Sequence, residues 1–198
     1  MFIVLEGLDG CGKTTQGNIL KNKLEELGYT VLLTREPGGT VVSEKLRDII
    51  LDKNIKDMDP FTEMYLYAAA RCQLVRQVVA PALKRGEAVI LDRFLLSSIA
   101  YQGYGRQLGE HTVRAVNFFA INGIEPDLTI LFDMRRNEDR LDMDRDRIEL
   151  SSKEFYDRVY KGYMCAYDKN KTLVVDASKS IEVIGDEIFD KVGELING

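Results

Sequence analysis

The sequence predicts an α/β fold in three layers, with a five-stranded parallel sheet between layers of helices. Short apolar runs alternate with helical patterns along the chain, which favours parallel strands joined by helical crossovers. The runs are apolar at successive positions, as expected for strands covered on both faces. The 198 residues are 45% hydrophobic and 30% charged, enough for a single domain over residues 1–198 and too few for two large ones.

Five short runs are assigned to strands. The first stops at a glycine-rich turn, and all five are rich in β-branched or other apolar residues. In a parallel sheet, ligands bind beyond the carboxyl ends of the strands, so we expect functional residues just after each run. The runs are Phe2–Leu5, Tyr29–Thr34, Ala88–Leu91, Leu128–Phe132 and Leu173–Val175.

The first and last helices follow from apolar residues that recur on one face. Gly28 ends the first of them. The apolar positions are Leu20, Leu24 and Leu27 in the first helix, and Ile184, Ile188, Val192 and Leu195 in the last.

A long helix is predicted in the middle of the chain. Asp59 and Pro60 are typical of an N-cap and a first-turn proline, and the helical pattern continues to Gly86. Pro81 interrupts it, so we expect a kink there.

Composition excludes several classes of protein. Lys plus Arg number 27 against 32 Asp plus Glu, and the net charge of −5 argues against nucleic acid or anionic membranes as partners. Three widely spaced cysteines and one histidine argue against a disulfide framework, a zinc site or a catalytic triad. No apolar run is long enough to span a bilayer and no basic leader precedes the first strand, so a cytoplasmic location is expected.

The turn after the first strand matches the phosphate-loop pattern G-x-x-x-x-G-K-[ST]. Its glycines let backbone N–H groups converge on phosphate oxygens, while Lys13 bridges phosphates and Thr14 can bind Mg²⁺. The predicted architecture is therefore the P-loop NTP hydrolase fold. The predicted nucleotide-binding residues are Gly7, Leu8, Asp9, Gly10, Cys11, Gly12, Lys13, Thr14 and Thr15.

This loop alone leaves switches, motors, transporters and small-molecule kinases open. A guanine-nucleotide switch needs an Asn-Lys-x-Asp motif, and after Asn170-Lys171 the aspartate is missing. Asp9 is informative, because a carboxylate beside a triphosphate costs electrostatic energy unless it serves Mg²⁺ or a substrate hydroxyl. Its presence suggests a second ligand close by.

Tyr67 and Arg71 lie four residues apart on the long helix and share a face. A ring that stacks and a guanidinium that donates can together hold a flat base. Because arginine only donates, it would suit O4 of thymine or uracil and oppose the amino group of cytosine. From spacing alone, a core tyrosine with a surface arginine remains an equal alternative.

Asp92 and Arg93 directly follow the third strand. This position places Arg93 at the carboxyl edge of the sheet, where a transferring phosphoryl group would lie. Asp92 would hold a water on Mg²⁺ or pair with Arg93, and a purely structural ion pair is the alternative.

Seven segments, taken in order, resemble the thymidylate kinase family of the nucleoside monophosphate kinase group. The resemblance runs from residue 2 to about residue 177 and is most specific after the phosphate loop. The segments are EGLDGCGKTT (6–15), TREPGGT (34–40), YAAAR (67–71), DRF (92–94), AYQG (100–103), PDLT (126–129) and DRIE (146–149).

The resemblance implies transfer of the γ-phosphoryl group of ATP to dTMP, with Mg²⁺ as cofactor, in dTTP biosynthesis. It implies that Tyr67 stacks on thymine, Arg71 bonds O4 and Arg93 binds the acceptor phosphate. Asp9 would lie near the 3′-hydroxyl and Mg²⁺, and Tyr101 would exclude a ribose 2′-hydroxyl. The other expected substrate contacts are Glu36, Pro37, Arg47, Ser97, Ser98, Gln102 and Tyr163; the expected metal contacts are Thr14 and, through water, Asp92.

Gly10 stands where some relatives place an arginine, so the chain resembles the type that supplies a catalytic arginine from a short mobile lid. The lid is expected at residues 136–149. If it were helical, Arg136, Arg140 and Arg147 would share a face. The segment is several residues shorter than usual, which leaves the choice among Arg140, Arg145 and Arg147 open.

Two other functions stay open. A deoxynucleoside kinase would need a carboxylate base for a neutral hydroxyl, and Glu36 is the best candidate. A nucleotide-dependent switch or assembly ATPase would hydrolyse ATP slowly and respond to a protein partner. The family resemblance also implies a homodimer formed through helix faces.

Overall fold

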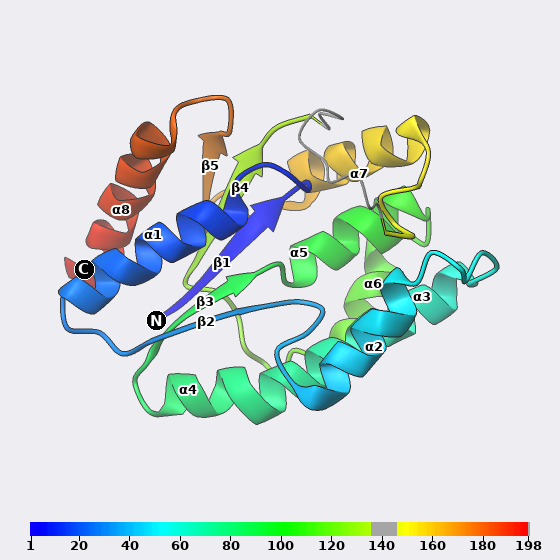
Figure 1. Ribbon diagram of the computed structural model, residues 1–198, viewed down its shortest axis with the longest axis horizontal. Helices are drawn as coiled ribbons and strands as arrows, with labels where there is room; N and C mark the ends of the chain where they lie inside the picture. The colour runs from blue at the N-terminus through cyan, green and yellow to red at the C-terminus, as the bar shows by residue number, and fades with distance from the viewer. Residues whose placement is uncertain (136–145, 198) are drawn as a thin grey trace.

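The computed structural model describes residues 1–135 and 146–197. Five parallel strands form one sheet in the order β2-β3-β1-β4-β5, which confirms the predicted three-layer α/β class (Figure 1). The strands extend one or two residues beyond several of the predicted ends. Their bounds are β1 Phe2–Gly7, β2 Val31–Arg35, β3 Ala88–Asp92, β4 Leu128–Asp133 and β5 Thr172–Asp176.

The two faces of β1 pack on different helices because successive side chains point in opposite directions. Ile3 and Leu5 belong to a core shared with α1 (Lys13–Glu26) and α8 (Ile181–Asn197). Phe2 and Val4 belong to the core on the opposite face. β1 is therefore buried on both sides, as its unbroken apolar run predicts.

The remaining helices cover that opposite face and its extension beyond the carboxyl edge (Figure 1). Three of them, α2, α6 and α7, lie in stretches for which the sequence reasoning named no helix. Their bounds are α2 Val41–Leu51, α3 Pro60–Leu74, α4 Ala80–Lys84, α5 Leu95–Ser98, α6 Glu110–Asn117 and α7 Lys153–Ala166, with wider π-helical turns at Val75–Val79 and Ile99–Gly105.

The long central helix begins where the sequence predicts. The Asp59 side chain accepts from the N–H groups of Phe61 and Thr62, at 2.9 and 3.3 Å. A π-helical turn, Val75–Val79, interrupts the helix just before Pro81, where a kink was expected. Pro81 has no N–H and its ring crowds the preceding turn, and widening that turn accommodates both.

The register of the sheet brings the ends of three strands together. Asp92 at the end of β3 pairs with Leu5 on β1 and with Arg35 on β2. The phosphate loop, the TREPGGT segment and Arg93 therefore leave the sheet side by side. Among the residues described, no helix has the length and apolar character needed to cross a membrane.

Candidate active site

The phosphate loop joins β1 to α1 through three glycines with positive φ. These are Gly7 at 141°, Gly10 at 74° and Gly12 at 96°, values that side-chain-bearing residues rarely adopt. A Cβ on Gly7 would lie 2.9 Å from the Phe132 carbonyl oxygen, so this glycine is also needed for packing. Leu8 and Cys11 are buried in the core, so their contribution to a nucleotide site is confined to the backbone.

Lys13 curls back over this loop. Its Nζ donates to the carbonyl oxygens of Gly7 and Leu8, at 3.1 and 2.8 Å, and the side chain is buried. A cation is thereby held against the phosphate loop. Together with the start of α1, this arrangement is suited to the phosphates of a nucleoside triphosphate.

Thr14 and Asp92, the residues expected to contact Mg²⁺, lie next to each other beside the loop. Thr14 Oγ1 lies 3.4 Å from Asp92 Oδ2, while Asp92 Oδ1 is buried and has no hydrogen-bond partner within residues 1–135 and 146–197. In the same part of the chain, no cluster of three or more His, Cys, Asp or Glu residues could hold a metal ion alone. These residues fit Mg²⁺, which keeps several waters and shares its coordination with substrate phosphates.

Arg93 stands at the carboxyl edge in a left-handed backbone conformation, with φ of 70°. Its NH1 donates to Gly7 O, Ser97 Oγ and Tyr163 Oη at 2.9 to 3.1 Å, and its NH2 lies 2.6 Å from Asp9 Oδ1. A strained residue that is held at so many points is typical of a functional position. The guanidinium is fixed between the phosphate loop and the neighbouring pocket.

Asp9 is held ionised by two cations. Burial opposes its ionisation, but Arg93 and Lys13 outweigh burial and lower the pKa of Asp9 to about 2. The hydroxyl of Tyr101 donates to its second oxygen at 3.2 Å. Asp9 therefore offers a charged acceptor to a substrate hydroxyl or a hydrated metal ion.

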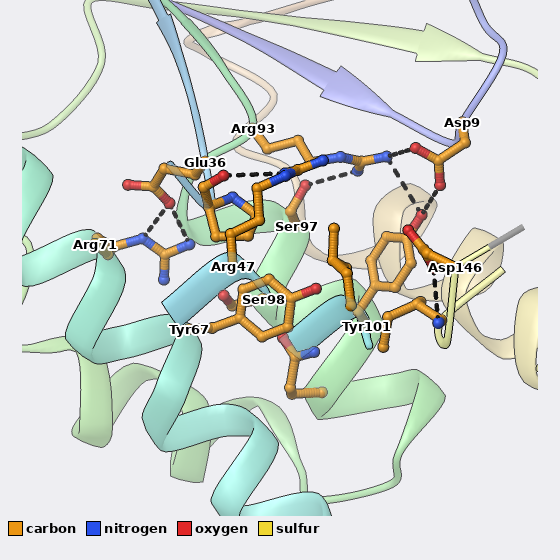
Figure 2. A pocket seen from close by; sticks show the side chains of 14 residues that line it. Asp9, Glu36, Arg47, Tyr67, Arg71, Arg93, Ser97, Ser98, Tyr101 and Asp146 are labelled. Carbon is orange, nitrogen blue, oxygen red and sulfur yellow. Dashed lines mark hydrogen bonds and ion pairs between the residues drawn. The ribbon is translucent and has the colours of Figure 1, made fainter. Parts of the chain in front are cut away.

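A second pocket lies on the side of Arg93 that faces α3 (Figure 2). Figure 2 shows the Arg71–Glu36 pair at one end of this pocket and the Arg93–Asp9 pair at the other. The lining residues are Asp9, Glu36, Pro37, Arg47, Leu51, Tyr67, Arg71, Arg93, Ser97, Ser98, Tyr101, Gln102, Asp146 and Ile148.

Arg71 is buried on α3 but belongs to the pocket wall. It ion-pairs with Glu36 at 2.7 Å and donates to the Phe94 carbonyl oxygen at 2.9 Å and to Asn117. Burial raises the pKa of Glu36 to about 7, although the Arg71 charge works against that rise. These contacts use part of the five-donor guanidinium and fix its plane.

Tyr67 lies one turn before Arg71, and its side chain and that of Ser98 both line the pocket (Figure 2). Burial raises the pKa of Tyr67, so its hydroxyl stays protonated at neutral pH. Gln102 donates to Glu63 at 2.9 Å, and this bond fixes its amide. Tyr163, also expected at the substrate, lies outside the pocket lining and contacts Arg93 from behind.

Arg147 is anchored to α2 and α3. It donates to the Ile50 carbonyl oxygen and to Glu63, both at 2.8 Å, and Glu63 also pairs with Arg106 at 3.0 Å. Glu63 is almost fully buried, so it needs these cations close by. The structure thus gives Arg147 a partner that the helical-face argument did not anticipate, while Asp146 and Ile148 beside it line the pocket.

The other lid arginines fall outside the described part of the chain. This applies to the predicted phosphate contacts Arg140 and Arg145 and to the third member of the predicted face, Arg136. Their proposed roles stay predictions.

The pocket and the cleft above the phosphate loop meet at four residues that line both. These are Asp9, Glu36, Arg47 and Arg93. Two of these four residues are arginines, and they lie where the cleft above the phosphate loop meets the pocket. This placement suits two anionic ligands bound end to end. The fold and the site together define a P-loop kinase whose acceptor also carries a phosphate.

A model of the family described as "Thymidylate kinase" matches residues 5–188. The chain belongs to the thymidylate kinase family. This confirms the predicted family and the predicted enzyme class, a dTMP kinase phosphotransferase for which ATP is a substrate.

Similar proteins agree over almost the whole chain. A thymidylate kinase of Exiguobacterium sp. is 45% identical over 198 residues, covering 96% of this chain and 92% of the relative. One of Desulforudis audaxviator is 46% identical and covers 99% of this chain and 91% of its own length. The crystal structure of thymidylate kinase from Ehrlichia chaffeensis has a TM-score of 0.79 at 32% identity, covering 97% of this chain and 98% of that chain.

Two buried carboxylates at the site, Glu6 and Glu63, carried no predicted role. Glu6 contacts the groups that surround Arg93, and Glu63 links α3 to Arg106 and Arg147. A signal was present for Glu6, since it is the one charged residue in the apolar first strand. Glu63 lacked such a signal, because a glutamate in the first turn of a helix is ordinarily exposed.

Proposed function

We propose that this chain transfers the γ-phosphoryl group of ATP to the 5′-phosphate of dTMP through the residues that join its two cavities. The observation that carries this proposal is the sharing of Arg47 and Arg93 between the phosphate-loop cleft and the pocket on α3. A donor chain on the loop and an acceptor phosphate in the pocket would meet there. Their negative charges would be neutralised where phosphoryl transfer takes place.

The donor half of the site is assigned to the loop residues 7–15, with Lys13 bridging the phosphates. Mg²⁺ would be held by Thr14 and, through water, by Asp92, and would neutralise charge on the transferring group. The buried and unpartnered Oδ1 of Asp92, within the described part of the chain, supports this assignment. Arg140 and Arg145 are proposed to add positive charge from the lid.

The acceptor half is assigned to side chains from several elements. Arg93 and Arg47 bind the phosphate, Tyr67 stacks on the base, and Arg71 donates to O4. Tyr101 packs beside the deoxyribose and Asp9 accepts from the 3′-hydroxyl. The attacking phosphate oxygen is already deprotonated at neutral pH, so the residues have to position and neutralise rather than remove a proton.

Base and sugar selectivity follow from these assignments. A guanidinium that only donates favours thymine and uracil over cytosine, whose amino group at position 4 also donates. The Tyr101 ring beside the sugar leaves no room for a ribose 2′-hydroxyl. Glu36, Pro37, Ser97, Ser98 and Gln102 complete the pocket wall.

One coupled assay tests the function. It compares dTMP, dUMP, dCMP, UMP and thymidine as acceptors at equal concentration, with ADP release as the signal. We expect turnover with dTMP and dUMP, and little with dCMP or UMP. Comparable rates with dCMP would remove Arg71 from base recognition.

The same assay separates the two rival functions. A deoxynucleoside kinase would phosphorylate thymidine and would use Glu36 as a base, whereas Glu36 here is paired with Arg71. A switch ATPase would release ADP slowly whether or not dTMP is present. Acceleration of ADP release by dTMP, with none by thymidine, contradicts both.

We further propose a homodimer of single-domain chains in the cytoplasm. Apolar side chains gather on α3 and just after α6, where Phe61, Tyr65, Phe118 and Phe119 are 47 to 76% exposed. Such a face suits a second copy of the chain. Light scattering after size exclusion should give the mass of two chains; the mass of one chain would contradict the dimer.

A further inference from the structure

The buried carboxylate of Glu6 lies behind Arg93, and no step of the proposed transfer uses it. Glu6 is on β1, one residue before the phosphate loop, and none of its surface is exposed. Burial raises the pKa of Glu6, so this carboxylate costs free energy unless its partners satisfy it. The groups that donate to it therefore indicate what it holds in place.

One carboxylate oxygen of Glu6 holds the backbone next to Arg93. Oε1 accepts from the N–H groups of Phe94, at 2.9 Å, and Ser97, at 3.1 Å. Arg93 has φ of 70°, a conformation that costs a non-glycine residue free energy. Because Phe94 follows directly, its bond to Glu6 secures the strained turn that carries Arg93.

The other carboxylate oxygen holds the surroundings of the guanidinium. Oε2 accepts from the hydroxyl of Ser97 and lies 3.4 Å from that of Tyr163. Both hydroxyl oxygens accept from NH1 of Arg93, at 3.1 and 2.9 Å. Glu6 thus supports the backbone of Arg93 through Phe94 and its side chain through Ser97 and Tyr163.

We propose that Glu6 is a positioning residue that holds Arg93 in the orientation from which it binds the acceptor phosphate. The inference rests on the proposed role of Arg93. Misplacement of a transferring group by about 1 Å can cost on the order of 10²-fold in rate. Loss of Glu6 therefore lowers turnover and weakens acceptor binding, while the ATP site on the phosphate loop keeps its affinity.

The test is Glu6→Gln, which keeps the shape but replaces one acceptor oxygen by a donor. We expect kcat with dTMP to fall about 10- to 100-fold, by the positional argument above, with a raised KM for dTMP and an unchanged KM for ATP. The matched control is Asp127→Asn, because Asp127 accepts the N–H of Phe2 at the opposite end of β1, at 2.7 Å. The control should keep the kinetic constants of the unmodified chain.

A double-mutant cycle with Arg93→Lys shows whether Glu6 acts through Arg93. If it does, the double variant is no slower than Arg93→Lys alone, within about threefold. If kcat of the double variant is lowered by the product of the two single reductions, the inference is overturned. So does a folded Glu6→Gln variant with unchanged kcat and KM.

If Glu6→Gln does not fold, Tyr163→Phe takes its place in the cycle, because it removes one of the two hydroxyls that link Glu6 to Arg93. We expect it to lower kcat without a loss additive to that of Arg93→Lys, and unchanged kcat overturns the inference. The unmodified chain is assayed first. If it does not phosphorylate dTMP, the proposed function and this inference fall together; if it does, a silent Glu6 variant removes the inference alone.

Discussion

The phosphate loop and the pocket proposed for the acceptor are each assigned a phosphate group, but they are built in different ways. The loop is one continuous stretch whose backbone is proposed to bind phosphate, with Gly7, Gly10 and Gly12 in positive-φ conformations. The pocket is lined by side chains that converge from α2, α3 and α5, from the segments just after β2 and β3, from the π-helical turn Ile99–Gly105, and from Asp9 and Asp146. A site made of backbone groups is determined by adjacent residues, whereas a site made of side chains depends on the whole fold.

The two regions also differ in what a mutation disturbs. Charged residues of the pocket are paired with one another, as in Arg71–Glu36 and Arg93–Asp9, at 2.7 and 2.6 Å. Lys13, by contrast, contacts loop carbonyl oxygens. We therefore expect loop substitutions to change activity, and pocket substitutions to change activity and stability together.

The largest expected effect is on turnover. Lys13→Ala and Arg93→Ala should each lower kcat with dTMP by about 10³-fold or more, because each removes charge from the transition state. Circular dichroism should show both folded, with the Arg93 variant the less stable because Asp9 loses its partner. The control is Lys21→Ala, which removes a lysine on the surface of α1 that pairs with Glu25, and this variant should be fully active. Near-normal turnover in either test variant would show that the substituted residue, Lys13 of the loop or Arg93 of the pocket, does not stabilise the transition state.

Acceptor discrimination should come next. We expect kcat/KM for dCMP to be at least about 10³-fold below that for dTMP, since a site of fixed donors leaves the cytosine amino group facing Arg71. Steady-state kinetics with both acceptors measure the ratio. A ratio below about tenfold would show that side-chain geometry in the pocket does not determine the base.

Buried and exposed ion pairs should contribute differently to the free energy of unfolding. Glu63→Gln should lower the free energy of unfolding by about 3 kcal/mol or more, because Arg106 and Arg147 lose a buried counter-charge. Lys153→Ala, which breaks an exposed pair with Asp157, should cost less than about 1 kcal/mol. Urea titrations of both variants measure the two values. Equal losses in the free energy of unfolding would mean that the ion pairs of Glu63 with Arg106 and Arg147 do not hold the pocket together.

The smallest expected effect is a dependence of stability on pH. Burial raises the pKa of Glu36 to about 7, so the protonated form favours the fold. Its contribution is complete below the ordinary glutamate range and is lost as pH rises through about 7, by up to about 3 kcal/mol. Relative to Glu36→Gln, the unmodified chain should thus become less stable between pH 5 and pH 8. If the free energies of unfolding of the two proteins changed with pH in parallel, that result would contradict the raised pKa of Glu36.

The parts that could be predicted from sequence are those that depend on neighbours in the chain. The apolar strands, the Asp59 cap and the phosphate loop all have local causes. Helix α7 had a readable signal as well, because Phe155, Tyr156, Val159 and Tyr163 recur on one buried face.

What the sequence could not show is which side chains become partners. Arg147 was one of three candidate phosphate contacts, and the structure pairs it with Glu63, 84 residues away. Tyr163 was expected at the substrate and lies behind Arg93. Both outcomes depend on buried charges that need partners, and burial is set by the packing of elements distant in sequence.

The most direct measurement uses a compound in which adenosine and thymidine are joined through their 5′ positions by a chain of phosphates. If Lys13 and Arg93 bind two phosphate groups end to end in one cleft, this compound should compete with ATP and with dTMP, and bind more tightly than either. Competition with one substrate alone, or affinity no better than that of ATP, would contradict the continuous site.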